Sequence, residues 1–206
     1  MRIAIYTLTK DRLELTKQMM ASLDGKTNFP FDHYIIDQNS TDGTLEYLKD
    51  FTYKLGKLFV FPLSRNLGIN GGDAFALDKI GKKYDVIIKL DNDALIMTNG
   101  WLEQCLSVLA TKLIISPYIL GLLNNRGGVP RYKYDKEKNL GYTYALGGIC
   151  LIGRTKAWFE DSGGFPSCLP ADYHHDDMEF CARLRSKGYK FAYKEDVEIR
   201  HLENIK

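Results

Sequence analysis

The sequence predicts an α/β domain with a mostly parallel central sheet and helices on both of its faces. Strand-type runs alternate with helix-type runs through the first half of the chain, and polar residues follow the end of each predicted strand there. The chain has 206 residues, which suits a single domain. Hydrophobic residues make up 45% and charged residues 26%, which excludes a disordered tail, a collagen-like fibre or a coiled coil.

The alternation begins with an apolar run at residues 3–8, which predicts the first strand. A helix is expected at residues 12–23, because Leu15, Met19 and Leu23 recur at helical spacing. Further strands are predicted at 32–36, 58–61 and 85–90, and further helices at 44–51, 70–80 and 100–109. The segment 70–73, Asn-Gly-Gly-Asp, is expected to cap the start of the third helix.

The pattern changes after Ser116. Residues 117–146 contain glycines, two prolines and several tyrosines, and predict a small mixed or antiparallel extension with a mobile loop at 124–128. Regular structure is expected again from residue 147, with helices near 155–161 and 176–187 and strands near Lys190 and Val197. No linker divides the chain, so one domain over residues 1–206 is expected.

Composition excludes several classes of function. The 28 basic and 26 acidic side chains give a net charge of +2, too balanced for a nucleic-acid binder that depends on phosphate contacts. The longest mostly apolar stretch, residues 113–123, is shorter than the roughly 20 residues of a membrane-spanning helix. The cysteines lack a Cys-x-x-Cys pair and are expected to be free thiols, which favours the cytoplasm or the cytosolic face of a membrane; they are Cys105, Cys150, Cys168 and Cys181.

Ligands of open α/β sheets bind at the carboxyl ends of the strands. The residues that follow the predicted strands are polar and lie at 7–12, 37–43, 64–66 and 91–93. Each group alone is also compatible with a turn, a helix cap or a solvated loop. Their convergence at one edge of the sheet favours a binding site.

The segment Asp91-Asn92-Asp93 follows a buried strand and carries two carboxylates two residues apart. Such a pair suits Mg²⁺ or Mn²⁺, which prefer oxygen ligands and often bridge carboxylates to substrate phosphates. An Asp-x-Asp pair also occurs by chance in many chains.

A second polar cluster lies at the start of a predicted amphipathic helix. Met178, Cys181 and Leu184 form its apolar side, and Asp176 and Asp177 stand at its N-terminus, where the helix dipole favours negative charge. One aspartate can cap the helix while the other points into a cleft. The preceding residues 174–175 are both histidine, but a zinc site is not expected because no further ligands accompany them.

In this order, the segments resemble the inverting glycosyltransferases of family 2. The resemblance lies in residues 3–7 with Arg12, then 35–44, 65–72, 91–93 with 101–103, 147–154, 163–165, 176–189 and His201. It implies the GT-A fold, a Rossmann-like α/β/α sandwich with a nucleotide-binding half at about 1–116 and an acceptor and catalytic half at about 117–206. Because relatives usually continue beyond the late histidine, the resemblance also implies that the chain can be one domain of a longer polypeptide.

The resemblance implies a role for each matching residue. The nucleotide-binding residues would be Thr7, Thr9, Arg12, Asp37, Gln38, Arg65, Asp91 and Asn92. Asp93 and His201 would bind the metal, Mn²⁺ or Mg²⁺, and Asp177 would be the general base. Gly147, Gly148, Asp176 and Tyr144 would lie on the side of the acceptor and donor sugar. Two departures leave alternatives: Gln38 replaces an acid of many relatives, and the choice between Asp176 and Asp177 as the base rests on alignment.

The implied activity is transfer of a hexosyl group from a nucleoside diphosphate sugar to a hydroxyl of a glycan or other acceptor. UDP-sugar is the expected donor, with guanosine and deoxythymidine forms as alternatives. The cation would stabilise the leaving diphosphate, and a carboxylate base with one in-line displacement would invert C1. Two alternatives are a sugar-1-phosphate nucleotidyltransferase, which would need a glycine-rich loop absent from residues 7–10, and a catalytically silent sugar-nucleotide-binding module.

Aromatic residues divide into two groups. Trp101 and Trp158 are predicted to be core or edge residues of helices and not sugar contacts. The tyrosines at 132 and 134, like those at 142 and 144, are spaced to share a strand face and predict either an aromatic platform for a sugar ring or ordinary hairpin packing.

Overall fold

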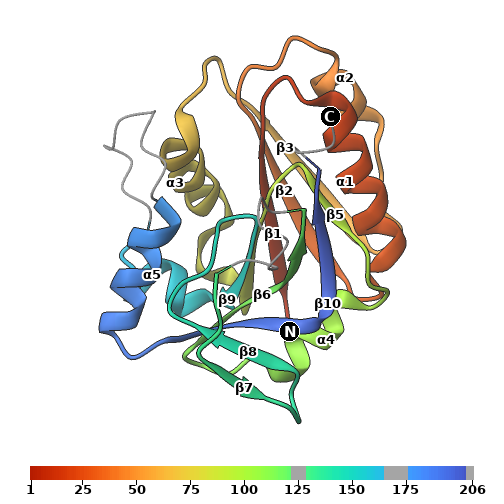
Figure 1. The fold of residues 1–206 in the computed structure, drawn as a ribbon. Coiled ribbons are helices and arrows are strands. Elements are labelled where there is room, and N and C mark those ends of the chain that lie inside the picture. The colour runs from red at the N-terminus through yellow and green to blue at the C-terminus, as the bar shows by residue number, and fades with distance from the viewer. Residues whose placement is uncertain (122–128, 165–175, 203–206) are drawn as a thin grey trace.

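A computed structural model describes residues 1–121, 129–164 and 176–202, with the backbone alone at Asp176 (Figure 1). The loop predicted at 124–128, the histidines at 174–175 and Cys168 lie outside the described residues. The described cysteines, Cys105, Cys150 and Cys181, are buried free thiols. Within these ranges no helix combines the length and the apolar character that a membrane span requires.

The first half of the chain forms the predicted strand–helix units. Its strands are mutually parallel in the order β3-β2-β1-β4. They are β1 (Ile3–Thr9), β2 (Phe31–Asp37), β3 (Gly56–Pro62) and β4 (Val86–Leu90). The intervening helices are α1 (Leu13–Lys26), α2 (Thr44–Asp50) and α3 (Gly68–Ile80), followed by the short turn η1 (Gly81–Lys83). Figure 1 shows α1 and α2 on one side of the sheet and α3 on the other, so the predicted layered α/β fold is confirmed.

The second half of the chain extends the same sheet. The order continues from β4 as β9-β6-β10-β8-β7, and β5 pairs with β10. The bounds are β5 (Ala94–Ile96), β6 (Leu113–Leu120), β7 (Lys133–Asp135), β8 (Leu140–Thr143), β9 (Cys150–Arg154) and β10 (Lys190–His201). The helices of this half are α4 (Trp101–Val108) and α5 (Asp176–Ser186), the latter on the side of α3 (Figure 1). The β7–β8 hairpin supplies the antiparallel extension that the sequence predicts.

Several local predictions need correction. The two strands expected near Lys190 and Val197 are one strand, β10, whose pairing with β6 shifts register between Lys194 and Glu198. The inner strand β6 was not predicted from the sequence, and it contains a proline. Pro117 pairs with Lys194 at this shift, where an irregular ladder tolerates the missing amide donor. The helix expected at 155–161 is present, with α-type geometry at 155–156 and π-type geometry in η2 (Ala157–Asp161).

The start of α3 also differs from the prediction. The helix begins at Gly68, so Asn70 and Asp73 are buried residues inside it and provide no cap. The amides at the start are satisfied from outside the helix: Leu67 N donates to Gln38 Oε1 (2.9 Å), and Gly68 N donates to Asn66 Oδ1 (2.8 Å). The cap predicted at 70–73 is therefore wrong: the helix begins before these residues, and one of the two amides at its start is bound by Gln38, which is distant in the sequence.

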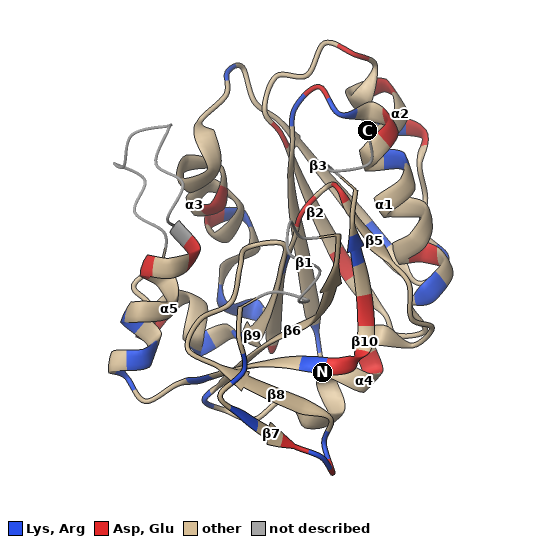
Figure 2. Cartoon of the chain, in the orientation of Figure 1, with Lys and Arg blue, Asp and Glu red and all other residues tan. Residues whose placement is uncertain are grey.

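The core confirms the prediction for both tryptophans. Trp101 and Trp158 are fully buried, and Trp101 Nε1 donates to Thr27 Oγ1 at 2.8 Å. The Trp158 ring lies between the rings of Tyr6 and Phe180, at centroid distances of 6.0 and 4.9 Å, and so ties α5 to the central strand β1. Figure 2 shows basic and acidic residues interspersed on helices such as α1, α3 and α5, whereas much of the central sheet is uncharged.

Candidate active site

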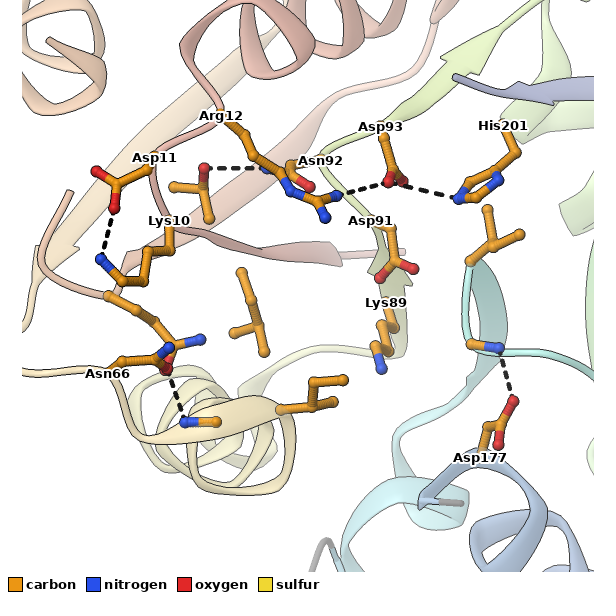
Figure 3. Close-up of a pocket in the computed structure, with 17 residues that line it drawn as sticks. Lys10, Asp11, Arg12, Asn66, Lys89, Asp91, Asn92, Asp93, Asp177 and His201 are labelled. Atoms are coloured by element: carbon orange, nitrogen blue, oxygen red, sulfur yellow. Dashed lines mark hydrogen bonds and ion pairs between the residues drawn. The ribbon is translucent and has the colours of Figure 1, made fainter. Parts of the chain in front are cut away.

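The main cavity has a volume of about 770 Å³ and lies at the carboxyl ends of β1 and β4 (Figure 3). Segments that are distant in the sequence meet there: the β1–α1 loop, the start of α3, the residues after β4, the loop before β9, the first turn of α5 and the end of β10. The predicted site residues that line it are Thr9, Arg12, Gln38, Asp91, Asn92, Asp93, Gly148, Asp177 and His201.

Asp93 is the most constrained carboxylate of the main cavity. It is 3% exposed, Arg12 Nη1 donates a hydrogen bond to its Oδ2 at 2.8 Å, and His201 Nε2 lies 3.4 Å from the same oxygen. Burial acts to raise the pKa of Asp93, but His201 and Arg12 together hold this pKa below its usual value. Its Oδ1 is buried and accepts no hydrogen bond from the described residues.

Asp91 lines the same cavity. Burial raises the pKa of Asp91 to about 7, against the opposing charge of Lys89 and with a further rise from Asp93. Its backbone amide donates to the carbonyl of Ile149 at 2.9 Å, which fixes the strand end against the loop before β9. Two neighbouring carboxylates in one buried space repel each other, and a bound cation would relieve this repulsion.

The carboxylate of Asp93 and the imidazole of His201 fit a divalent cation that also contacts a bound ligand. The structure, as far as it is described, has no cluster of three or more metal-ligating side chains. It does have the buried, unpartnered Oδ1 of Asp93 with His201 at hydrogen-bond range of the same carboxylate. Mg²⁺ and Mn²⁺ commonly take one or two carboxylates and complete their shell with phosphate oxygens and water. Asp93 and His201 therefore suit a cation held jointly with a diphosphate.

Thr9 and Asn92 line the main cavity, but their side chains hydrogen-bond to each other. Asn92 Nδ2 donates to Thr9 Oγ1 at 3.1 Å, and the Thr9 hydroxyl shares a hydrogen bond with Thr16 Oγ1 at 3.0 Å. All three residues are buried. This network fixes the loop after β4 to the start of α1, so Arg12 and Asp93 are held in register.

Three of the predicted nucleotide-binding residues do not line the main cavity. Thr7 lies inside the sheet, where its hydroxyl donates to the Leu90 carbonyl at 2.7 Å and contacts His33 Nε2 at 2.9 Å. Asp37 is 1% exposed and accepts a hydrogen bond from Ser40 N at 3.2 Å. Arg65 lines an adjoining groove along α3, which shares Asn66 with the main cavity.

Asp177 stands across the main cavity from Asp91 and Asp93 (Figure 3). It lies in the first turn of α5, where its Oδ1 accepts a hydrogen bond from Met178 N at 2.7 Å and its Oδ2 accepts one from Gly148 N at 3.1 Å. A Cβ at Gly147 would lie 3.8 Å from the same Oδ2, so this glycine segment passes directly against the carboxylate. Both carboxylate oxygens of Asp177 are therefore held in place by backbone amides.

The remaining predicted residues lie nearer the surface. Tyr144 is 65% exposed, its ring centroid is 4.7 Å from that of Tyr132, and its carbonyl accepts a hydrogen bond from Arg185 Nη1 at 2.7 Å. Tyr132 is 51% exposed as well, so the pair presents aromatic surface to solvent. The side chain of Asp176 lies outside the described residues.

Residues 5–146 match the family model described as Glycosyl transferase family 2, which spans more than half of the chain. The chain belongs to glycosyl transferase family 2. It is 26% identical over 193 residues to the O-antigen chain rhamnosyltransferase WbaN of Salmonella anatum, an alignment that covers 87% of this chain and 59% of that protein.

Solved glycosyltransferases share the fold of this family 2 chain. The mannosyltransferase PcManGT from Pyrobaculum calidifontis, in complex with GDP-Man and Mn²⁺, matches with a TM-score of 0.77 and 17% identity over 100% of this chain and 58% of that one. TarS 1-349 of S. aureus, in complex with UDP-GlcNAc, matches with a TM-score of 0.72 and 18% identity over 100% and 62%. This confirms the GT-A fold. The chain spans about three fifths of the length of these relatives.

The family motifs did not point to every residue of the main cavity. Lys89 also lines it and pairs with Asp73, which is fully buried in α3. A signal was present in the sequence: Lys89 is the single charged residue in the strand Val-Ile-Ile-Lys-Leu. A lysine that interrupts a fully buried strand needs a partner, but its partner follows only from the three-dimensional packing.

Proposed function

We propose that this protein is a metal-dependent, inverting glycosyltransferase that moves a hexosyl group from a nucleoside diphosphate sugar to a hydroxyl of a glycan or other acceptor. The observation that carries the proposal is the placement of Asp177 opposite Asp91, Asp93 and His201 across one cavity. A cation-binding wall facing a carboxylate is the arrangement that transfer between a diphosphate and a hydroxyl requires.

UDP-sugar is the proposed donor, with guanosine and deoxythymidine diphosphate sugars as alternatives. Support comes from the family and from the fold relatives whose complexes contain UDP-GlcNAc and GDP-Man. The diphosphate would lie beside Asp91 and Asp93, where the loop after β1 brings the Arg12 guanidinium. We also propose a cytoplasmic location, at which the buried free thiols at 105, 150 and 181 would stay reduced.

Asp93 and His201 would hold Mn²⁺ or Mg²⁺ in this proposal. When bound, the cation supplies positive charge that stabilises the leaving diphosphate without a proton. Arg12 adds a fixed positive charge on the other side of Asp93, 2.8 Å from its Oδ2. The network of Thr9, Thr16 and Asn92 keeps both groups in place through catalysis.

Asp177 would accept the proton of the acceptor hydroxyl. The acceptor oxygen then forms its bond to C1 while the bond from C1 to the diphosphate oxygen breaks, and the electron pair leaves with the diphosphate. The amides of Gly148 and Met178 hold the Asp177 carboxylate toward the acceptor side. A single displacement from the face opposite the leaving group inverts the configuration at C1, and general-base assistance contributes about 10²–10⁴-fold.

A screen of nucleotide sugars tests this function. Thermal unfolding is measured with UDP, GDP and dTDP sugars, each with and without Mn²⁺, and the stabilising donor is then incubated with hydroxyl acceptors. Metal-dependent stabilisation followed by an inverted anomeric signal in the NMR spectrum of the product is the expected result. Retention at C1, or stabilisation by nucleoside triphosphates with release of pyrophosphate, would replace this proposal with another reaction.

A further inference from the structure

A buried charged pair forms part of the wall of the main cavity. Lys89 lies within β4, all of whose residues are buried, and its side chain lines the cavity. Its Nζ lies 3.3 Å from Asp73 Oδ2, with side-chain exposures of 7% for the lysine and 0% for the aspartate. The pair joins the central sheet to α3, the helix that covers this face (Figure 1).

Fold stability alone is a weak reason for this pair. Removing two charges from water carries a large desolvation penalty, and replacing a buried ion pair with apolar residues of similar volume is often neutral or stabilising. Every other residue of β4 is apolar, so an apolar side chain in place of the lysine would match the rest of this buried strand. The charged pair therefore points to a role at the cavity that the side chain lines.

The ammonium group lies between the two reacting sides of the main cavity. It is close enough to Asp91 to act on its pKa, and it lies 3.3 Å from the position that a Cβ on Gly148 would take. Gly148 donates its amide proton to Asp177. In Figure 3, Lys89 lies next to Asp91, on the side toward Asp177. Nζ therefore packs closely against the Gly148 backbone, and both residues line the main cavity.

Under the proposed function, the part of the main cavity lined by Lys89 and Gly148 receives the donor sugar. The diphosphate is placed at Asp93 and His201 and the acceptor hydroxyl at Asp177, so C1 and its ring must lie between them. Asp73 compensates the charge of Lys89. The pair then offers N–H donors with little net charge, which suits a neutral hydroxyl better than a phosphate.

We propose that Lys89 donates a hydrogen bond from its ammonium group to a hydroxyl of the donor sugar and so contributes to sugar specificity, with Asp73 as the positioning residue that holds the ammonium. This inference rests on the proposed function. It goes beyond it by assigning recognition of the sugar, separately from the nucleotide, to two residues outside the Asp-x-Asp segment and the base.

The test compares donor binding with binding of the bare diphosphate. Dissociation constants are measured by calorimetry with Mn²⁺ for UDP-glucose, UDP-GlcNAc, GDP-mannose and dTDP-rhamnose, and for UDP, GDP and dTDP. For the donor that the wild type binds, Lys89→Met is expected to weaken binding about 10- to 100-fold, the range for a hydrogen bond to a charged group. Binding of the matching diphosphate is expected to change less than about 3-fold. Asp73→Asn is expected to weaken donor binding selectively, in the same direction.

Single-hydroxyl deletions of the same donor sharpen the test. The wild type is expected to bind one deoxy analogue, the one that lacks the hydroxyl bound by Lys89, more weakly than the parent donor. Lys89→Met is expected to bind that analogue and the parent donor equally. Lys194→Met is the matched control, because Lys194 is also a 5% exposed strand lysine paired with an aspartate, Asp196, but does not line the main cavity. If Lys89→Met does not fold, Lys89→Gln replaces it in the same measurements.

The outcomes separate the possible failures. Equal weakening of donor and diphosphate in the Lys89 variants would assign the lysine to the diphosphate or to the fold and overturn the inference. Unchanged donor affinity, or an equal effect of Lys194→Met on the ratio of the two constants, would overturn it as well. If the wild type binds none of the nucleotides, the proposed function itself fails, together with the inference built on it.

Discussion

Arg12 Nη1 donates a hydrogen bond to Asp93 Oδ2 at 2.8 Å, and this contact joins the loop after the first strand to the segment after the fourth. His201, at the end of β10, approaches the same oxygen to 3.4 Å. Asp93 Oδ2 thus connects the segment after β4 with the loop after β1 and the end of β10. Its second oxygen remains buried and without a partner among the described residues, which makes Asp93 the natural test of the metal site.

Asp93→Asn is expected to abolish the Mn²⁺-dependent part of the thermal stabilisation by the nucleoside diphosphate that binds the wild type. The amide is neutral and a poor ligand for a hard cation, so the apparent metal affinity should fall at least about 10-fold. Asp50→Asn, at an exposed carboxylate at the end of α2, is the control and should leave the shift unchanged. An undiminished shift in Asp93→Asn would remove Asp93 from the metal site.

Asp177→Asn is expected to keep metal-dependent binding of the nucleotide but lower the rate of sugar transfer by about 10²–10⁴-fold. The amide oxygen can still accept the hydrogen bond of Gly148, whereas it cannot take the acceptor proton. Asp176→Asn and Glu179→Gln change the other acids of the first turns of α5 and test which one is the base. A wild-type rate in Asp177→Asn would exclude it from this role.

The buried His33 should make stability depend on pH. Burial lowers its pKa to about 3, whereas the unfolded chain binds this proton near the ordinary histidine value of 6.5. As the pH falls below about 6.5, the unfolded state takes up the proton first, so the free energy of unfolding falls by up to about 1.4 kcal/mol per pH unit until the pH nears 3. Urea unfolding of the wild type and of His33→Gln between pH 7 and pH 4.5 measures this effect.

The variant lacks the titrating ring, so the stability advantage of the wild type should be largest at pH 7 and shrink as the pH falls. His33 bonds to Tyr53 OH at 2.7 Å and to Thr7 Oγ1 at 2.9 Å, and loss of these contacts lowers stability at every pH. Parallel pH curves for the two proteins would show that His33 does not titrate on unfolding.

Gly153→Ala is expected to destabilise the fold by about 1–3 kcal/mol through overpacking. An added Cβ would lie 2.6 Å from Ile114 Cδ1 and 3.2 Å from Trp158 Nε1, and both neighbours are fully buried. Gly25→Ala is the matched control, because nothing lies within 4 Å of its added Cβ and the helical position should gain about 0.5–1 kcal/mol. Chemical denaturation measures both, and a neutral Gly153→Ala would mean that the sheet shifts to accept the methyl group.

Local patterns predicted a large part of the fold. The strand–helix alternation up to residue 109 and the hairpin after it follow from side-chain periodicity, which the chain carries in short windows. Errors arose where a contact from far away decided the outcome. Gln38, distant in the sequence, binds the amide that precedes α3, and Pro117 lies where the pairing of β10 with β6 shifts register.

The candidate site divides in the same way. The sequence by itself predicted Asp91 and Asp93 from the end of a strand and Asp177 from the start of a helix, because such ends are local properties, and the resemblance to family 2 added His201. Only the tertiary structure decided that Thr7 turns into the sheet and that Lys89 meets Asp73 beside Gly148. Side-chain partners across a sheet and its covering helix are chosen by packing between distant segments, where burial makes each unpaired polar group costly.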